Sequence, residues 1–176
     1  MKNPWRELEP KNDDGTFKVV IEIPKGSQNK YELNLASGVI ELEKKLQPEQ
    51  TFIFDYGFIP QTLGGDNDPL DVVVLGDDKL SQGAVVNIKL SGVMRMIDEG
   101  KIDNKLIGIL AGDTYWEENI DNPNVLKQEF KKIENWFKKY KKIEGTDLKI
   151  TGFDLANSAI KEVKKAMVNY EKIFLN

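Results

Sequence analysis

The chain has 176 residues, with 25 Lys and Arg against 29 Asp and Glu, which gives a formal net charge of -4. This length suits a single domain over residues 1–176, and the acidic balance argues against general nucleic-acid binding, which requires a basic surface. Cysteine and histidine are absent, which excludes disulfides, thiolate chemistry, Ser-His-Asp mechanisms and the usual zinc sites.

The N-terminal residues 1–17 are polar and punctuated by proline and glycine, so they predict a leader rather than a core element. Residues 1–10 lack the apolar stretch of a signal peptide. No apolar run in the chain is long enough to span a membrane. We therefore expect a cytoplasmic protein that has no membrane partner.

Two apolar runs in the first third of the chain predict strands. Residues 18–24 form a run that Pro24 closes, and its single acidic residue, Glu22, is expected on the solvent face of an edge strand. Residues 51–60 carry aromatic side chains at strict alternation, which is typical of a core strand. Tyr56 stands next to a glycine in this run, so its hydroxyl is expected to emerge near a turn.

A hairpin is expected between these two strands. Residues 30–35 alternate between apolar and polar side chains, residues 36–38 form a turn, and residues 39–42 return as the second strand. Lys30 and Glu32 therefore lie on one side of a strand, about 7 Å apart. The charged residues 43–45 that follow are typical of a solvated loop.

An acidic turn then leads into a buried strand. Asp66, Asp68 and Asp71 fall within six residues, and the apolar run 72–75 follows at once. Carboxylates this close are tolerated only if water solvates them or a cation lies between them. The rigid Pro69 and the position of Asp71 at the start of the strand limit access to water. Without histidine or cysteine, any metal here would have oxygen ligands, which favours Mg, Mn or Ca.

A second charged turn joins two further strands. Residues 84–97 predict a long strand bent at residues 91–92, residues 98–105 form the turn, and residues 106–110 form the next strand. A hairpin would make the ends of these strands neighbours. Those ends carry Asp98, Asp103 and Lys105.

The last third of the chain changes to a helical period. Residues 113–124 look irregular, and a helix follows that ends at Gly145 and presents an apolar face of Leu126, Phe130, Ile133, Phe137 and Tyr140. Residues 148–153 predict a short strand. Asp154 is the candidate N-cap of a second helix whose inward residues are Ile160, Val163, Met167 and Tyr170. Many strands followed by helices indicate an α+β domain, and seven or so short strands favour a closed barrel.

Several of these segments together resemble one protein family. Residues 66–72, Asp-Asn-Asp-Pro-Leu-Asp-Val, resemble the D-x-D-P-x-D-V motif of soluble inorganic pyrophosphatases of the first structural family, bacterial type. Other family motifs occur in the family's order and near its spacing, at residues 21–24, 30–32, 56–57, Asp98, 103–105 and 140–141. The resemblance covers roughly residues 18–172.

This resemblance implies an α+β fold with a five-stranded closed β-barrel, OB-like, on which additional strands and two C-terminal helices pack. It implies a Mg²⁺-dependent inorganic diphosphatase, which hydrolyses pyrophosphate to two orthophosphates with a metal-activated water. It also implies a homo-oligomer, with a hexamer favoured, whose partner is the pyrophosphate substrate rather than a nucleic acid or a membrane.

The resemblance also implies roles for individual residues. Several Mg²⁺ ions per active site would be held by Glu22, Glu32, Asp66, Asp71, Asp98 and Asp103. Asp68 and Tyr56 would be catalytic, with Asp68 accepting the proton of the water. Substrate would be bound by Lys30, Lys44, Tyr56, Lys105, Tyr140 and Lys141. Lys44, with Lys45 beside it, stands where the family usually has an arginine; lysine keeps the charge but loses the planar two-pronged grip.

Two other functions are alternatives. A calcium-binding structural module would explain the acidic turn, but an EF-hand loop requires an oxygen ligand at position five and glycine at position six. This chain has Leu70 and Asp71 there. An oligonucleotide-binding barrel would require a basic, aromatic groove, whereas the charged positions here are largely acidic. A phosphate-release assay with Mg²⁺ separates both alternatives from the enzyme.

Overall fold

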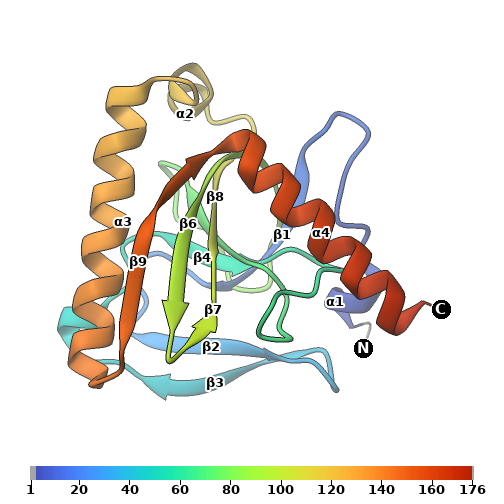
Figure 1. Cartoon of the computed structure of the whole chain (residues 1–176), viewed down its shortest axis with the longest axis horizontal. Coiled ribbons are helices and arrows are strands. Elements are labelled where there is room, and N and C mark those ends of the chain that lie inside the picture. The colour runs from blue at the N-terminus through green and yellow to red at the C-terminus, as the bar shows by residue number, and fades with distance from the viewer. Residues whose placement is uncertain (1–2, 176) are drawn as a thin grey trace.

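In the computed structural model, which describes residues 3–175, strands dominate the first two thirds of the chain and long helices the last third (Figure 1). The strands are β1 (Phe17–Ile23), β2 (Asn29–Asn34), β3 (Val39–Lys45), β4 (Asp55–Phe58), β5 (Asp71–Leu75), β6 (Val85–Asp98), β7 (Lys101–Ile102), β8 (Lys105–Leu110) and β9 (Leu148–Leu155). The helices are α1 (Pro4–Glu7), the 3-10 turn η1 (Pro48–Gln50), α2 (Thr114–Asn119), α3 (Pro123–Glu144) and α4 (Ala156–Phe174). The predicted α+β class is confirmed.

Five strands form a ring-like sheet. Their order is β1-β4-β5-β8-β6, and β6 also pairs with β1, which brings the two ends of the row together. The pairing of β5 with β8 is parallel, and the other pairings in the ring are antiparallel. Strands β7 and β9 extend the sheet along β6. The predicted hairpin is present as β2 and β3, which form a separate two-stranded sheet within the described part of the chain.

The long strand β6 bends where the sequence predicts it. Its register against β8 shifts between Leu90 and Gly92. A side chain at Gly92 would lie 2.7 Å from the main-chain oxygen of Asp154 and 2.8 Å from the ring of Phe130. Glycine is therefore required at this point because β9 and α3 both approach the bend.

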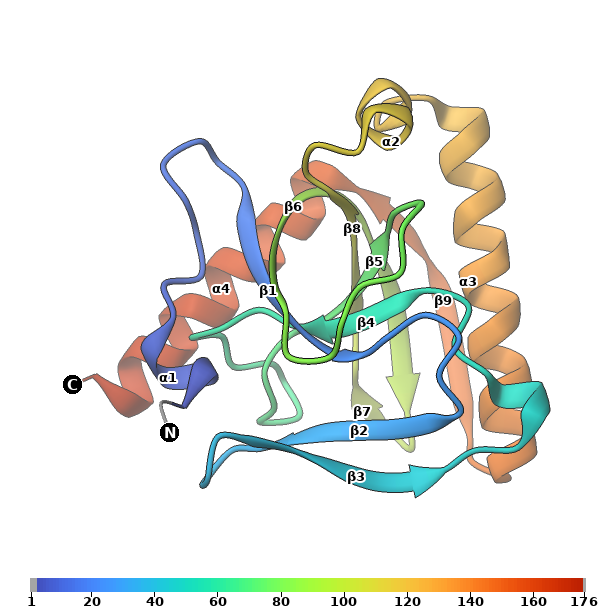
Figure 2. The ribbon, with the colours of Figure 1, turned by 180° about the vertical axis from the view of Figure 1, so that it is seen from behind.

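The helices cover different sides of the ring. Figure 1 and Figure 2 show α3 running along β9 and α4 crossing on the other side, against β6. The predicted apolar face of α3 is buried, and Gly145 ends the helix in the left-handed region with φ 73°. Helix α4 buries Ala159, Val163, Ala166 and Tyr170. The predicted N-cap Asp154 is wrong, because Asp154 lies in β9 and its carboxylate accepts a hydrogen bond from Arg95.

Four further expectations require correction. Residues 4–7, expected in a leader, form α1, which buries Trp5. Residues 114–119, expected to be irregular, form α2, because the Asp113 side chain accepts a hydrogen bond from the Trp116 N–H. Residues 43–45 belong to β3 rather than to a loop. Glu22 is not on an edge strand, since β1 pairs with both β4 and β6, and only 6% of Glu22 is exposed.

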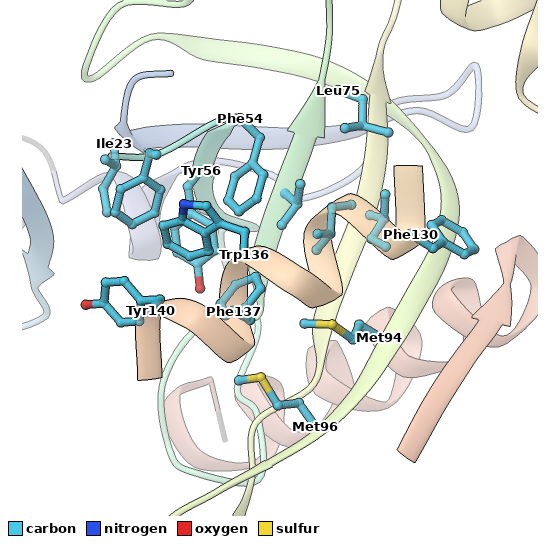
Figure 3. Close-up of a cluster of buried hydrophobic side chains, with 14 of the residues drawn as sticks. Ile23, Phe54, Tyr56, Leu75, Met94, Met96, Phe130, Trp136, Phe137 and Tyr140 are labelled. Atoms are coloured by element: carbon cyan, nitrogen blue, oxygen red, sulfur yellow. The ribbon is translucent and has the colours of Figure 1, made fainter. Parts of the chain in front are cut away.

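An aromatic cluster joins the ring to α3. It contains Phe52, Phe54, Trp136 and Phe137 together with aliphatic side chains of the ring, as the close-up in Figure 3 shows in part. Tyr56 and Tyr140 belong to the same cluster, and both are buried. The predicted aromatic alternation is therefore a core feature, although the strand itself begins only at Asp55. The cluster fixes the C-terminal half of α3 beside the ring.

Candidate active site

One pocket of about 200 Å³ brings almost all of the predicted site residues together. The hairpin of β2 and β3 crosses one end of the ring, near the tip of β7 and the C-terminal end of α3 (Figures 1 and 2). Lining the pocket are Glu22, Lys30, Glu32, Tyr56, Asp66, Asp68, Asp71, Asp98, Asp103, Lys105, Tyr140 and Lys141. Lys44 is the one predicted site residue that does not line it.

The turn that precedes β5 is held by its own hydrogen bonds. The Asp66 Oδ1 accepts from the Asp68 N–H at 3.1 Å, and the Gly64 N–H donates to the Asp68 carbonyl at 2.7 Å. Asn67 adopts φ 75°, a left-handed conformation that asparagine tolerates better than most residues. The Leu70 N–H donates to the Thr62 hydroxyl at 3.0 Å. Asp68 is therefore presented at a defined place in the pocket wall.

The pKa of Asp68 lies above that of an ordinary aspartate, although the residue is exposed at its surface. Burial raises the pKa of Asp68, and the negative charges of Asp66 and Asp71 raise it further. No donor within residues 3–175 makes a hydrogen bond or ion pair with this carboxylate, whereas Asp71 is paired with Lys105. A carboxylate with these properties is suited to accept a proton.

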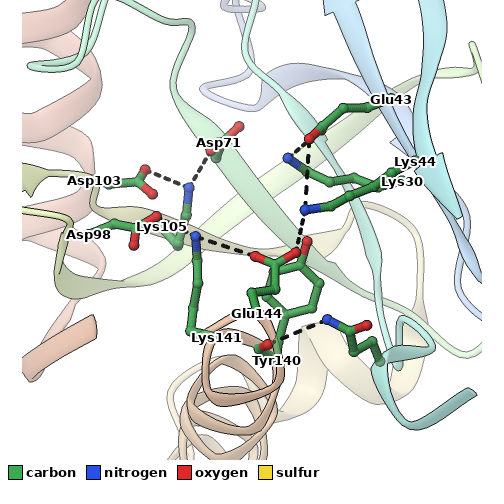
Figure 4. Close-up of polar contacts among 11 residues, drawn as sticks. Lys30, Glu43, Lys44, Asp71, Asp98, Asp103, Lys105, Tyr140, Lys141 and Glu144 are labelled. Atoms are coloured by element: carbon green, nitrogen blue, oxygen red, sulfur yellow. Dashed lines mark hydrogen bonds and ion pairs between the residues drawn. The ribbon is translucent and has the colours of Figure 1, made fainter. Parts of the chain in front are cut away.

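Lys105 lies at the centre of the acidic side of the pocket. Its ammonium contacts Asp71 and lies 2.5 Å from the Asp103 Oδ1, and only 5% of the residue is exposed (Figure 4). Burial lowers the pKa of Lys105, but Asp71, Tyr56 and Asp103 outweigh this effect and hold the pKa well above its ordinary value. The ring of Tyr56 is 5.9 Å from this ammonium. Lys105 therefore carries a permanent positive charge between two carboxylates.

Glu22 is the most deeply buried acid of the pocket. Its Oε1 accepts a hydrogen bond of 2.7 Å from the Leu33 N–H, which ties β1 to the hairpin. Burial raises the pKa of Glu22 to about 8, and the charge of Asp71 contributes. A cation beside Glu22 would favour its charged form.

Two further lysines of the pocket, Lys30 and Lys141, are paired with carboxylates, as Figure 4 shows. The ammonium of Lys30 lies 2.5 Å from Glu43, and that of Lys141 lies 2.5 Å from Asp98. Lys141 is also 3.9 Å from Glu144, the last residue of α3. The pocket therefore contains ammonium groups whose charge is balanced by protein carboxylates.

Lys44 does not belong to the pocket lining. Its ammonium contacts Glu144, is 3.9 Å from Glu43, and is 5.9 Å from the centre of the Tyr140 ring. Lys45 is exposed. Sequence reasoning missed Glu43 and Glu144. Glu43 lies in a segment assigned to a loop, and no sequence signal separates Glu144 from the other acids of α3.

The carboxylates that line the pocket suit a divalent ion that prefers oxygen ligands. The Asp98 Oδ1 is buried, and nothing in the described part of the chain donates to it. Within residues 3–175, no three acidic side chains are gathered as a ready-made metal site. Ammonium groups lie instead against Asp71, Asp98 and Asp103. Because carboxylates line this side of the pocket and oxygen is the only ligand type, a hard cation such as Mg²⁺ suits it.

Comparison with known proteins agrees with this geometry. The inorganic pyrophosphatase family matches residues 19–171. An inorganic pyrophosphatase of Picrophilus torridus is 33% identical over 170 residues, which cover 96% of each chain. Among described residues, no helix is long and apolar enough to cross a membrane.

Solved structures have the same architecture. The crystal structure of inorganic pyrophosphatase from Thermus thermophilus matches with a TM-score of 0.85 and 36% identity, covering 97% of this chain and 99% of that chain. The inorganic pyrophosphatase of Helicobacter pylori matches with a TM-score of 0.84 and 37% identity, covering 94% and 99%. Given the ring-like sheet, the carboxylate-lined pocket and these matches over nearly the whole chain, the chain belongs to the inorganic pyrophosphatase family.

Proposed function

We propose that this pocket hydrolyses inorganic pyrophosphate to two orthophosphates with several Mg²⁺ ions. The observation that carries the proposal is one pocket lined by carboxylates, among them Asp68 and Asp71, and by the ammonium-bearing side chains of Lys30 and Lys141. Pyrophosphate is a small, highly charged anion, and an acidic protein binds it only where cations gather. The relatives, which are named inorganic pyrophosphatases, support the same substrate.

The carboxylates divide into two groups by position. Asp71 and Asp103, which contact Lys105, would together with Asp66 hold the ions nearest the attacking water. Asp98, Glu22 and Glu32 would hold further ions beside the substrate. Bound divalent ions neutralise phosphate charge and lower the pKa of a coordinated water.

The chain's own groups supply the proton transfer and the phosphate contacts. The Asp68 carboxylate takes the proton of the attacking water, since its raised pKa and lack of a donor keep it available. Burial raises the pKa of Tyr56 well above its ordinary value, so its hydroxyl stays protonated and donates to a phosphate oxygen. Tyr140 behaves in the same way, because burial and the charge of Glu144 raise its pKa. Its hydroxyl has no partner among the described residues.

The lysines neutralise the phosphate that leaves. Lys30 and Lys141 line the pocket directly, and each exchanges a protein carboxylate for a phosphate oxygen when substrate binds. Charge-assisted hydrogen bonds of this kind are strong where water is excluded, and they strengthen as negative charge develops on the leaving group. Asp66, Asp71 and Asp103 form the acidic wall of the pocket. Lys105 contacts Asp71 and Asp103 and contributes a positive charge beside them.

Three broader features belong to the same proposal. The five-stranded ring would be a closed, OB-like barrel, because β1 pairs with both of its neighbours in the ring. Residues 1–176 would act as one domain, as a homo-oligomer, with a hexamer favoured by the family resemblance. The protein would work in the cytoplasm without nucleic-acid or membrane partners. Light scattering of the purified chain tests the oligomeric state.

A phosphate-release assay tests the function directly. With pyrophosphate and Mg²⁺, the chain is expected to release orthophosphate, and exhaustive chelation is expected to abolish that release. Ca²⁺ is expected to activate poorly because its larger, flexible coordination shell misplaces the water. Absence of phosphate release at saturating Mg²⁺ would return the chain to the calcium-binding or oligonucleotide-binding alternatives. Activity that survives chelation would remove the metal mechanism.

Lys44 provides a more specific prediction. The family resemblance assigns Lys44 a phosphate contact, which would replace its contact with Glu144 when substrate binds. Lys44→Ala is therefore expected to raise the KM for pyrophosphate by roughly 10- to 150-fold, since a lost charge-assisted contact costs about 1.5–3 kcal/mol. Lys44→Arg is expected to be tolerated or to lower KM, because guanidinium restores the two-pronged grip. Steady-state kinetics at fixed Mg²⁺ measures both variants.

Lys45→Ala is the matched control for this prediction, because Lys45 is the exposed neighbour on the same strand. Its KM is expected to stay within twofold of the parent chain. If Lys44→Ala also leaves KM unchanged, then Glu144 holds Lys44 away from the substrate and the family arginine has no counterpart here.

A further inference from the structure

Residues 103–104 join β7 to β8 and belong to neither strand. Asn104 has a site residue on each side, because Asp103 and Lys105 both line the pocket. The Asp103 N–H still donates to the Met96 carbonyl at 3.0 Å. In a regular antiparallel pair the Met96 N–H would return a bond to the carbonyl of residue 103.

The side chain of Asn104 replaces that main-chain acceptor. The Met96 N–H donates to the Asn104 Oδ1 at 3.1 Å. The carbonyl of residue 103 is thereby replaced as the acceptor in the ladder, and an amide side chain satisfies the Met96 N–H. A buried N–H requires such a partner, because leaving it unpaired costs about as much as a lost hydrogen bond.

The other end of Asn104 is tied to α4. The Asn104 Nδ2 donates to the Glu162 Oε1 at 3.1 Å. The second oxygen of Glu162 accepts from the Arg95 Nη1 at 2.8 Å, and the Arg95 Nε donates to Asp154 at 2.7 Å. Glu162 is therefore held in one orientation by Arg95, and it presents a fixed acceptor to Asn104. The connection runs from α4 to the edge of the pocket.

A small cavity of about 20 Å³ adjoins this connection. Asn104 and Glu162 line it together with Asp66, Asp71 and Asp103. These three aspartates also line the main pocket, so the Asn104–Glu162 pair lies close to the acidic residues of the site. A shift of residues 103–105 would move Asp103 and Lys105 together, since both are next to Asn104 in the chain.

We propose that Asn104, oriented by Glu162, is a positioning residue that sets the placement of Asp103 and Lys105 for Mg²⁺ binding. This inference rests on the proposed function, because it assigns a purpose to the acidic wall. Asn104 does not line the main pocket, so it acts through its two neighbours, Asp103 and Lys105. Partners that orient metal ligands in this way typically contribute 10- to 100-fold to metal affinity or activity.

The first test measures Mg²⁺ binding by calorimetry without pyrophosphate. Asn104→Ala and Glu162→Ala are each expected to raise the Mg²⁺ dissociation constant by roughly 10- to 100-fold. The double variant is expected to be no worse than Asn104→Ala alone, because Glu162 acts only through Asn104. Amide hydrogen exchange after chelation adds a readout independent of metal, and the Met96 N–H is expected to exchange faster in both single variants.

Asp154→Asn is the matched control. It removes a charged partner of Arg95 in the same network, but it leaves Asn104 and Glu162 in contact. Its Mg²⁺ dissociation constant and its Met96 exchange are expected to stay within twofold of the parent chain. Should Asp154→Asn weaken Mg²⁺ binding as much as Glu162→Ala, the network would be a general clamp on α4 and the inference would be wrong.

The outcomes separate this inference from the proposed function. A parent chain that binds Mg²⁺ but does not hydrolyse pyrophosphate would overturn the function, while the binding comparison would still decide the role of Asn104. Unchanged Mg²⁺ affinity in both alanine variants would overturn the inference, while hydrolysis by the parent chain would stand. If Asn104→Ala does not fold, Glu162→Ala and Asp154→Asn decide between the same two outcomes.

Discussion

Asp68→Asn is expected to bind Mg²⁺ nearly as the parent chain does and yet to lose roughly 10²–10⁴-fold in turnover, the usual size of a general-base contribution. The amide keeps the shape of the side chain and removes its ability to take a proton. The turn itself should persist, because its hydrogen bonds use the main chain of Asp68 and the side chain of Asp66. The measurement is turnover at saturating Mg²⁺, with Mg²⁺ affinity determined separately by calorimetry.

Asp71→Asn is the matched variant for this test, since it makes the same chemical change three residues away. Asp71 begins β5 and contacts Lys105, so it is placed as a metal ligand rather than as a free base. Its loss should weaken Mg²⁺ binding, and raising the Mg²⁺ concentration should recover part of its activity. Equal recovery of Asp68→Asn by Mg²⁺ would make Asp68 a ligand. Unchanged turnover per folded molecule in both variants would make them ordinary turn residues.

Lys105→Met is expected to lower the free energy of unfolding by about 3 kcal/mol in the presence of a chelator. Removing one partner of a buried charge pair costs about 3–5 kcal/mol because it leaves an uncompensated charge. The low end applies because the Asp71 side chain is still 28% exposed to water. Mg²⁺ is expected to restore much of the loss, since it supplies positive charge between Asp71 and Asp103. Urea unfolding with and without Mg²⁺ measures both effects.

Lys89→Met is the control for the same substitution at a surface pair. Lys89 lies 2.8 Å from Glu117, and the two side chains are 45% and 33% exposed. An exposed pair of this kind contributes at most about 1 kcal/mol, and Mg²⁺ should not change it. If the two lysine variants lose the same stability, Lys105 is not the counter-charge of the acidic wall.

Local sequence patterns determined the chemistry of the site because chemical type and spacing are visible in the chain itself. The absence of histidine and cysteine limits the ligands to oxygen. The turn before β5 takes its conformation from Gly64, Gly65, Asn67 and Pro69, which lie within six residues of one another. Alternation in residues 30–35 places Lys30 and Glu32 on the same side of β2, and both line the pocket.

Short local signals were weaker predictors where a cap or a distant partner decides the outcome. Helix α2 depends on the side chain of Asp113, which stands in a segment of turn-like composition. Asp154 has the composition of an N-cap, but Arg95, 59 residues earlier, binds it in β9 instead. Propensity is a weak prior in such cases because tertiary contacts override it.

Only the tertiary structure decided which charges are buried and which residues orient them. Glu22 looks like a solvent-facing residue in its own strand, and it is buried in the pocket, where its carboxylate accepts a hydrogen bond from the Leu33 N–H of the β2 hairpin. Glu144 and Glu162 are ordinary helix acids in the sequence, yet one holds Lys44 and the other holds Asn104. Burial and pairing depend on contacts between segments that are separated in the sequence. A local sequence pattern does not identify the partner residue in such a contact.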